Sequence, residues 1–371
     1  MLPRNEQESN LQSEVLDNKV TGRGLVIALL NINSLLAHID ELRIFMSGSK
    51  IDILAINETK LDSDINDNEI ELSGFEIVRN DRSTNGRSGG GVCIYLRNNL
   101  NYQIRSDLYD DQLECLTVEI TQPRSKSFLV STWYRPPSSP ANTFHAFENL
   151  IDKIDAEAKE LYLLGDLNVD ILTTNISHNQ LTLTSLLDIY GLSQMISDPT
   201  RVTPASRTLI DLCLTNAPEK IANSGVLHLG ISDHSLVYMT RKMRYERSDA
   251  RVIETRQFKN FNKTNFLHDL AQQPWEIVND QMDPDGMWVV WKDLLMETID
   301  KHAPLKRKQV SKKNSPWISN ELLGKIHKRD YLKKKAITRN DTETWQQYKQ
   351  ARNETNNAIR LAKKKYFTNN F

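Results

Sequence analysis

Cysteine is scarce in this chain of 371 residues, which has only 3, at Cys93, Cys115 and Cys213. They are an odd number spread far apart, and the sequence has neither a CxxC pair nor a Cys/His cluster with zinc-ligand spacing. The spacing therefore argues against a disulfide-stapled scaffold and against a structural zinc site. It suits a protein of a reducing compartment.

Long apolar runs are also missing. No segment approaches the roughly 20 apolar residues that a helix needs to cross a bilayer. Residues 1–22 are too polar for a secretory signal and are predicted to be disordered. We therefore expect an intracellular protein, nuclear or cytoplasmic or both, without membrane contact. The sequence implies no obligate protein partner.

Glycine and acidic residues both become rarer along the chain. Of the 14 glycines, 12 precede residue 231, which indicates a turn-rich first part. The net charge of -1 hides an asymmetry, since residues 241–371 carry 28 Lys and Arg against 16 Asp and Glu, a net of +12. Residues 301–371 alone have 19 basic and 5 acidic side chains. Such a block suits a polyanion such as DNA or RNA, although a solvated helical surface has the same composition.

Short apolar runs of strand length recur through the first 240 residues, and amphipathic helical segments lie between them. The runs predict strands at 25–32, 51–56, 91–96, 113–120, 128–134, 161–164, 209–214 and 235–239. Helical spacing is found at 35–46, 143–159 and 179–190, and later at 288–302, 319–335 and 342–367. The pattern predicts a mixed α/β domain over 23–240 with its sheets between helices, followed by a helical basic region over 241–371.

Five polar clusters stand at the ends of these predicted strands. They are Asn31-Ile-Asn33, Asn57-Glu-Thr59, Tyr134-Arg-Pro136, Gly165-Asp-Leu-Asn168 and Ser232-Asp-His-Ser235. Polar side chains gathered at one edge of an apolar sheet are typical of an active site on a rigid scaffold. Taken singly, each cluster also has an ordinary structural explanation, such as a turn acid or a helix cap.

Asp211 is harder to explain as a surface residue, because it lies inside the apolar run 209–214. A buried carboxylate is costly unless it is paired. Histidine is the natural partner of such a carboxylate.

The order and spacing of the clusters resemble the endonuclease/exonuclease/phosphatase superfamily. The resemblance covers about residues 24–240. It implies an α/β (α+β) fold, a four-layer sandwich of two mixed β-sheets flanked by helices, followed here by a mostly helical C-terminal extension.

Finer phrases are similar to the endonuclease domain of LINE-type (non-LTR) retrotransposon polyproteins. They are Asn31-Ile-Asn-Ser-Leu35, Ile56-Asn-Glu-Thr-Lys-Leu61 and Ile231-Ser-Asp-His-Ser235. Residues 313–319 and 328–330 are similar to the connector that precedes the reverse transcriptase of those polyproteins. The paired-aspartate motif of a polymerase is missing, so the resemblance implies a fragment or a shortened reading frame.

The resemblance implies an enzyme, a metal-dependent phosphodiesterase that uses Mg²⁺, or Mn²⁺ in its place, to nick double-stranded DNA. The metal would be bound by Glu58, Asn31 and Asp233. Catalytic roles fall to Asp166, His234, Asp211, Asn168 and Tyr134, and substrate binding to Asn33, Arg135, Thr200 and Arg201. Whether Asp166 or His234 is the general base stays open, and RNA is a second candidate partner for the basic helices.

Two other functions stay open at this point. One is a phosphomonoesterase of inositol-phosphate type, although the loops offer widely spaced arginines and not a compact lysine-rich pocket. The other is a catalytically idle remnant that binds nucleic acid through its basic end. An intact set of six residues argues against decay: Asn31, Glu58, Asp166, Asn168, Asp211 and His234.

Overall fold

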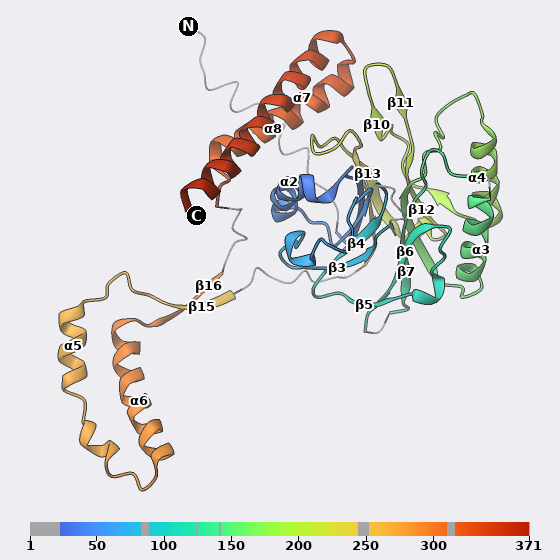
Figure 1. The fold of residues 1–371 in the computed structure, drawn as a ribbon. Helices are drawn as coiled ribbons and strands as arrows, with labels where there is room; N and C mark the ends of the chain where they lie inside the picture. The colour runs from blue at the N-terminus through green and yellow to red at the C-terminus, as the bar shows by residue number, and fades with distance from the viewer. Residues whose placement is uncertain are drawn as a thin grey trace. The chain divides into compact units, whose positions relative to one another are not determined.

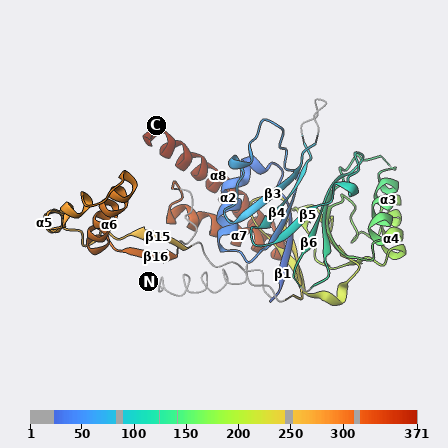
Figure 2. The same ribbon diagram turned by 90° about the horizontal axis from the view of Figure 1, so that it is seen from below.

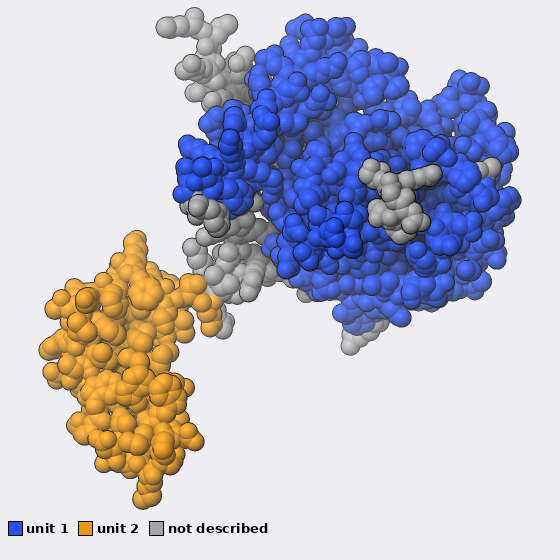
Figure 3. All heavy atoms as spheres, viewed as in Figure 1, with its two compact units in different colours: residues 1–246, 314–371 blue, residues 247–313 orange. Residues whose placement is uncertain are grey.

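The structure is a computed structural model that describes residues 23–82, 89–123, 125–140, 142–243, 252–309 and 316–370. The predicted disordered segment 1–22 and part of the connector-like phrase, 313–315, lie outside these residues. The chain forms two compact units, residues 1–246 with 314–371 and residues 247–313 (Figure 3). The predicted domain boundary at residue 240 stays a prediction.

A six-stranded sheet carries the first strand of the chain. Its order is β13 (Ile221–Leu227), β14 (Leu236–Arg241), β1 (Leu25–Asn31), β2 (Ile53–Asn57), β4 (Val92–Arg97) and β3 (Phe75–Asn80). Strands β1 and β2 are parallel, whereas β1 pairs antiparallel with β14. The sheet is therefore mixed, as predicted.

A second six-stranded sheet faces the first. Its order is β5 (Asn101–Ile104), β6 (Glu114–Thr121), β7 (Phe128–Tyr134), β8 (Glu160–Asp166), β12 (Asp211–Thr215) and β9 (Ser193–Gln194). Here β7 and β8 are parallel, and β12 runs antiparallel to β8. Each sheet thus has one parallel pair at its centre.

Helices cover both outer faces, which gives four layers (Figures 1 and 2). All seven residues of β1 are buried, and alternate side chains point to opposite faces. Leu25, Ile27 and Leu29 belong to the core that includes the second sheet, whereas Val26, Ala28 and Leu30 pack with residues of α2 (Leu35–Gly48). Beyond the second sheet lie α3 (Thr143–Asp155) and α4 (His178–Ile189), and the Phe147 ring of α3 stacks on Trp133 at 4.0 Å. The predicted fold class is confirmed.

The eight predicted strands are all present, but the outermost ones were not predicted. The strands β3, β5, β9 and β13 lie at sheet edges. Their side chains are partly exposed, with β5 carrying no buried residue. An edge strand has one solvated side and therefore lacks the continuous apolar run by which central strands are recognised.

Beyond residue 240 the predicted helices are confirmed as α6 (Pro284–His302), α7 (Asn320–Arg339) and α8 (Thr342–Asn370). Helices α7 and α8 form a hairpin that belongs to the first unit. The second unit contains α5 (Lys263–Ala271), α6 and the two-stranded sheet of β15 (Val252–Arg256) and β16 (Leu305–Gln309). No described helix combines the length and the apolar character that spanning a membrane requires.

Candidate active site

The polar clusters lie at one edge of the sandwich because of the strand register. Asn31 and Asn57 are the last residues of the parallel strands β1 and β2 and pair with each other. Tyr134 and Asp166 do the same at the ends of β7 and β8, and Asp211, which begins the antiparallel strand β12, pairs with Asp166. Parallel strands end at the same edge, so each sheet contributes a polar pair to one place.

A chain of hydrogen bonds joins the two sheets at this edge. Asn31 Nδ2 donates to Glu58 Oε1 at 2.8 Å and to Asp166 Oδ2 at 2.7 Å. Asn31 and Asp166 are buried, whereas 22% of the Glu58 side chain is exposed. One amide thus holds two carboxylates, one of them open to solvent.

Asn57 strengthens this junction, although the sequence pattern assigned it no role. Its side chain is fully buried, donates to Thr132 Oγ1 at 3.0 Å and accepts the Asp166 backbone N–H at 2.9 Å. The only sequence signal was its place beside Glu58. Asn57 therefore fixes the backbone of Asp166 relative to the first sheet.

Asp211 has the buried histidine partner that the sequence predicted, and this partner is His234. His234 Nδ1 lies 3.0 Å from both carboxylate oxygens of Asp211, and neither residue is more than 5% exposed. Burial disfavours the charged ring, but the carboxylates of Asp211, Asp166 and Asp233 outweigh it and raise the pKa of His234 to about 9. The site therefore favours an imidazolium at neutral pH.

Asp166 lies between this pair and the amide of Asn31. Its Oδ2 atom is 3.9 Å from His234 Nδ1, and its Oδ1 atom accepts the Asn168 backbone N–H at 3.1 Å. Burial and the nearby negative charge of Asp211 raise the pKa of Asp166, against the opposing effect of His234 and of the two hydrogen bonds. This carboxyl is therefore a better proton acceptor than an ordinary aspartate.

Asn33, Glu58 and Asn168, all at this edge, have left-handed backbone conformations, which residues other than glycine rarely adopt. The φ angles are 51° at Asn33, 53° at Glu58 and 50° at Asn168. Such angles cost free energy and are found more often at functional sites. The Asn168 side chain is held by a hydrogen bond from its Nδ2 atom to the Arg135 carbonyl at 2.9 Å.

Tyr134 lies at the same edge and is largely buried. Burial and the negative charges of Glu58 and Asp166 raise the pKa of its phenol. The phenol consequently stays protonated and able to donate a hydrogen bond.

Four charged or polar groups lie further out. Arg201 pairs with Asp233 at 2.9 Å, and both side chains are more than two-fifths exposed. Burial opposes ionisation of Asp233, but His234 and Arg201 outweigh it and lower the pKa of this carboxyl. Asn33 is exposed and accepts a hydrogen bond from Lys60, which lies 3.8 Å from Glu58 Oε2. Lys60 was not predicted, because a lone exposed lysine carries no sequence signal.

Arg135 and Thr200 differ from the substrate contacts expected of them. Arg135 is 1% exposed, and its guanidinium lies over the Phe144 ring at 4.8 Å. Thr200 is fully buried, and its hydroxyl accepts the backbone N–H of Asp211 at 3.1 Å. Both side chains are buried and do not face a ligand. They contact other residues that lie near the site.

The donor set suits a hard divalent cation. Asn31 and Glu58 offer an amide oxygen and a partly exposed carboxylate, and Mg²⁺ prefers a few such oxygen ligands beside its own waters. Asp233, the third predicted ligand, is already paired with Arg201. A second grouping, Asp166, Asp211 and His234, has potential ligand atoms within 4.8 Å of one another, but both Asp211 oxygens already face His234.

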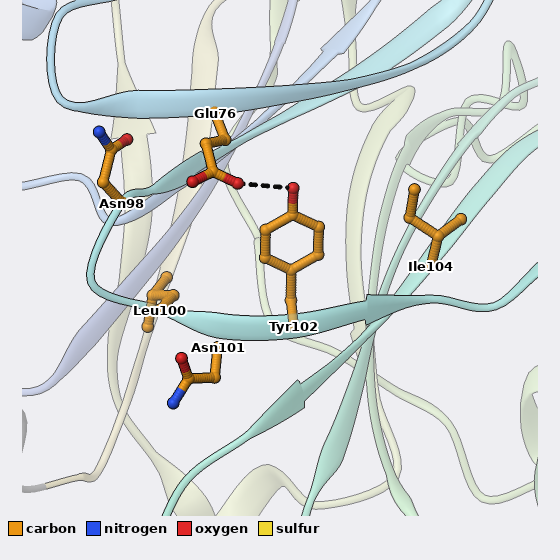
Figure 4. Close-up of a pocket in the computed structure, with 6 residues that line it drawn as sticks. All are labelled: Glu76, Asn98, Leu100, Asn101, Tyr102 and Ile104. Atoms are coloured by element: carbon orange, nitrogen blue, oxygen red, sulfur yellow. Dashed lines mark hydrogen bonds between the residues drawn. The ribbon is translucent and has the colours of Figure 1, made fainter.

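An open hollow lies away from these residues. It has a volume of about 570 Å³ and is lined by Glu76, Asn98, Leu100, Asn101, Tyr102 and Ile104 (Figure 4). Inside it the Tyr102 hydroxyl donates to Glu76 at 3.0 Å. A smaller pocket of about 270 Å³ reaches the site, since Tyr134 lines it.

Residues 28–234 match the Endonuclease/Exonuclease/phosphatase family. The chain belongs to this family. Its members are hydrolases, both nucleases and phosphatases, and they generally use divalent metal ions. Membership accounts for the polar edge of the sandwich and leaves the substrate open.

Similar solved structures include both kinds of enzyme. The endonuclease domain of TRAS1, a telomere-specific non-LTR retrotransposon, is 16% identical with a TM-score of 0.48, over 60% of this chain and 100% of that one. An AP endonuclease from Archaeoglobus fulgidus is 15% identical with a TM-score of 0.44, over 59% and 100%. A mannosyl-6-phosphatase from Bacteroides thetaiotaomicron is 15% identical with a TM-score of 0.43, over 58% and 98%. No curated protein matches the chain.

Proposed function

We propose that this protein is a Mg²⁺-dependent endonuclease that nicks double-stranded DNA, as the endonuclease of a LINE-type retrotransposon would. The observation that carries the proposal is the hydrogen-bonded chain Glu58–Asn31–Asp166 beside the His234–Asp211 pair. It combines oxygen ligands, a buried carboxylate and a cationic ring within one polar edge.

Hydrolysis of a phosphodiester must overcome three obstacles. Water is a weak nucleophile, negative charge builds up on the phosphate oxygens, and the leaving alkoxide is basic. A bound Mg²⁺, for which Mn²⁺ is an alternative, would neutralise charge and stabilise the leaving oxygen. Glu58 and Asn31 would hold it, with Asp233 a ligand if it leaves Arg201.

Asp166 is the candidate for orienting and deprotonating the attacking water. Its raised pKa brings its basicity closer to neutral pH, where a general base works best. The Asn168 side chain, fixed by the Arg135 carbonyl, would position that water or the phosphate. His234, held by Asp211, would contact the phosphate as an imidazolium, although a base role remains its alternative.

Tyr134 would donate its phenolic hydrogen to a phosphate oxygen in the same electrostatic scheme. Arg201 and Asn33 are the exposed candidates for DNA contacts beyond the scissile bond. Arginine contacts to phosphates position a duplex without reading its sequence. The basic helices α7 and α8 would add sequence-independent affinity for DNA or RNA.

Supercoiled plasmid incubated with the full chain tests this proposal. We expect nicking with Mg²⁺, none with EDTA, and none from Asp166→Asn or His234→Gln. Asp188→Asn, the same change at an exposed position of α4, is the matched control and should nick like the wild type. Nicking that survives both active-site changes would refute the assignment.

The same preparation separates the other two functions. Release of phosphate from inositol phosphates with the plasmid intact would identify a phosphomonoesterase. Binding of DNA with neither substrate changed would identify an idle nucleic-acid-binding protein.

A further inference from the structure

A lysine of α7 is buried against the loop that carries His234. Lys333 is 2% exposed, although lysine is among the residues least often buried. Its Nζ atom donates to the carbonyls of Leu229 at 2.7 Å and Ser232 at 2.6 Å, and the His234 carbonyl lies at 3.5 Å. A buried ammonium is costly unless its hydrogens are accepted, and here the acceptors are backbone atoms of one loop.

Arg329 and Asp330, which also belong to α7, contact the start of the same loop. The Gly230 N–H donates to Asp330 Oδ1 at 2.9 Å. Arg329 is fully buried, donates to the same oxygen at 3.0 Å and forms an ion pair with Glu41 of α2. A Cβ atom at Gly230 would lie 2.1 Å from Arg329 Nε, so the helix approaches this closely only because the loop has glycine there.

Helix α7 also contacts residues 201–208, a second segment next to the loop that carries His234. Val202 of β10 (Arg201–Val202) packs with Leu332 and Ala336 of α7. Arg207 of β11 (Arg207–Thr208) donates to the Ile337 carbonyl at 2.9 Å. This β10–β11 pair joins the loop through the Ser235 N–H, which donates to the Thr200 carbonyl at 2.8 Å.

We propose that Lys333 is a positioning residue of the active site, which fixes the backbone of residues 229–234 and thereby the place of His234 against Asp211. This inference rests on the proposed function and deepens it. Lys333 donates to the loop backbone and acts through His234. Helix α7, which the sequence assigned to a connector, is on this view a component of the nuclease site.

Lys333→Met in the full chain tests the proposal, because methionine fills similar space but cannot donate. We expect kcat for plasmid nicking to fall about tenfold or more with KM unchanged, since small displacements of a catalytic group are costly to rate. Amide hydrogen exchange of the peptide that covers residues 229–235 is expected to accelerate at least about tenfold, because its backbone carbonyls lose their hydrogen bonds from Lys333.

Two further variants make the result specific. Lys328→Met removes the same charge from an exposed position of α7 and should leave loop exchange at the wild-type rate; any change in its nicking measures the effect of charge alone. Gly230→Ala disturbs the neighbouring contact of the loop with Arg329 and Asp330 without removing a charge, and it should accelerate loop exchange as Lys333→Met does. If Lys333→Met does not fold, Gly230→Ala still tests whether the contact with α7 fixes the loop, and unchanged exchange would then overturn the inference.

The exchange measurement keeps this inference separate from the proposed function. Unchanged loop exchange in folded Lys333→Met, or a wild-type kcat, would overturn the positioning role. If the wild type nicks no DNA, the proposed function fails, and loop exchange alone then decides whether α7 fixes the His234 loop.

Discussion

Replacement of Asp211 by asparagine removes the charge that faces His234 and keeps the shape of the side chain. Both Asp211 oxygens lie 3.0 Å from His234 Nδ1, and Asp211 is fully buried. The rise in the pKa of His234 from 6.5 to about 9 corresponds to about 3 kcal/mol in favour of the imidazolium. Asp211 is the largest contribution in that direction.

Without Asp211 the effect of burial remains, so the pKa of His234 is expected to fall to about 6.5 or below. At pH 7.5 the imidazolium would drop from nearly all of the molecules to about a tenth. The nicking rate should fall at least about tenfold, and further if the ring also loses its orientation. Wild-type activity should decline only as the pH rises through about 9, whereas activity of the variant should decline already near 6.5.

Initial rates of plasmid nicking between pH 5.5 and 9.5 measure both profiles, and Asp188→Asn serves as the control. Thermal unfolding of each protein establishes that it is folded at every pH. A variant that keeps the wild-type profile, or a rate within about twofold of the wild type at pH 7.5, would refute the argument. A wild-type rate that still rises between pH 8 and 9 would instead indicate that His234 acts as a base, because Asp166, whose pKa is raised to about 7, is already deprotonated there.

Three other perturbations have defined outcomes. Glu58→Gln should raise the Mg²⁺ concentration for half-maximal nicking about tenfold, because a carboxylate ligand is lost; an unchanged Mg²⁺ titration would contradict a ligand role. Burial lowers the pKa of His228 to about 4, so the unfolded chain binds the proton more readily. The unfolding free energy of the wild type should therefore fall, by up to roughly 3 kcal/mol, as the pH falls from 6.5 through 4. Urea unfolding at pH 7 and 4.5 measures this fall, which should be smaller in His228→Gln. An equal fall in unfolding free energy in the wild type and in His228→Gln would show that His228 does not cause this pH dependence. Arg97→Met leaves the buried Asp52 without its ion pair, 3.1 Å in the wild type, and should lower the unfolding free energy by about 3 kcal/mol. A urea-unfolding loss below about 1 kcal/mol would show that the pair matters little.

The strands and helices of the core were predictable because the pattern that identifies each of them lies within a few neighbouring residues. Strands buried on both faces require consecutive apolar residues, and β1 has seven of seven buried. The polar clusters at the strand ends were visible for the same reason, since each interrupts such a run. A histidine partner for Asp211 followed from the cost of a lone buried carboxylate, and the structure shows that this partner is His234.

Other parts of the site depend on contacts between residues far apart in the chain. Asn57 donates to Thr132, which is 75 positions away, and nothing near Asn57 in the sequence indicates this partner. Arg135 follows a buried strand, yet whether its side chain turns inward or outward depends on the Phe144 ring supplied by α3. Sequence reasoning placed it at the surface, where most arginines lie.

The sequence by itself determined the central strands, the helices and the chemical types of the groups at the strand ends, because periodicity and burial act over a few neighbouring residues. Only the tertiary structure decided which lysine of a lysine-rich helix is buried. Lys333 and Lys328 lie on the same helix, but the carbonyls of Leu229 and Ser232, about a hundred residues away, accept hydrogen bonds from Lys333. A local pattern cannot specify such a partner, because the acceptor is a backbone atom that every residue possesses.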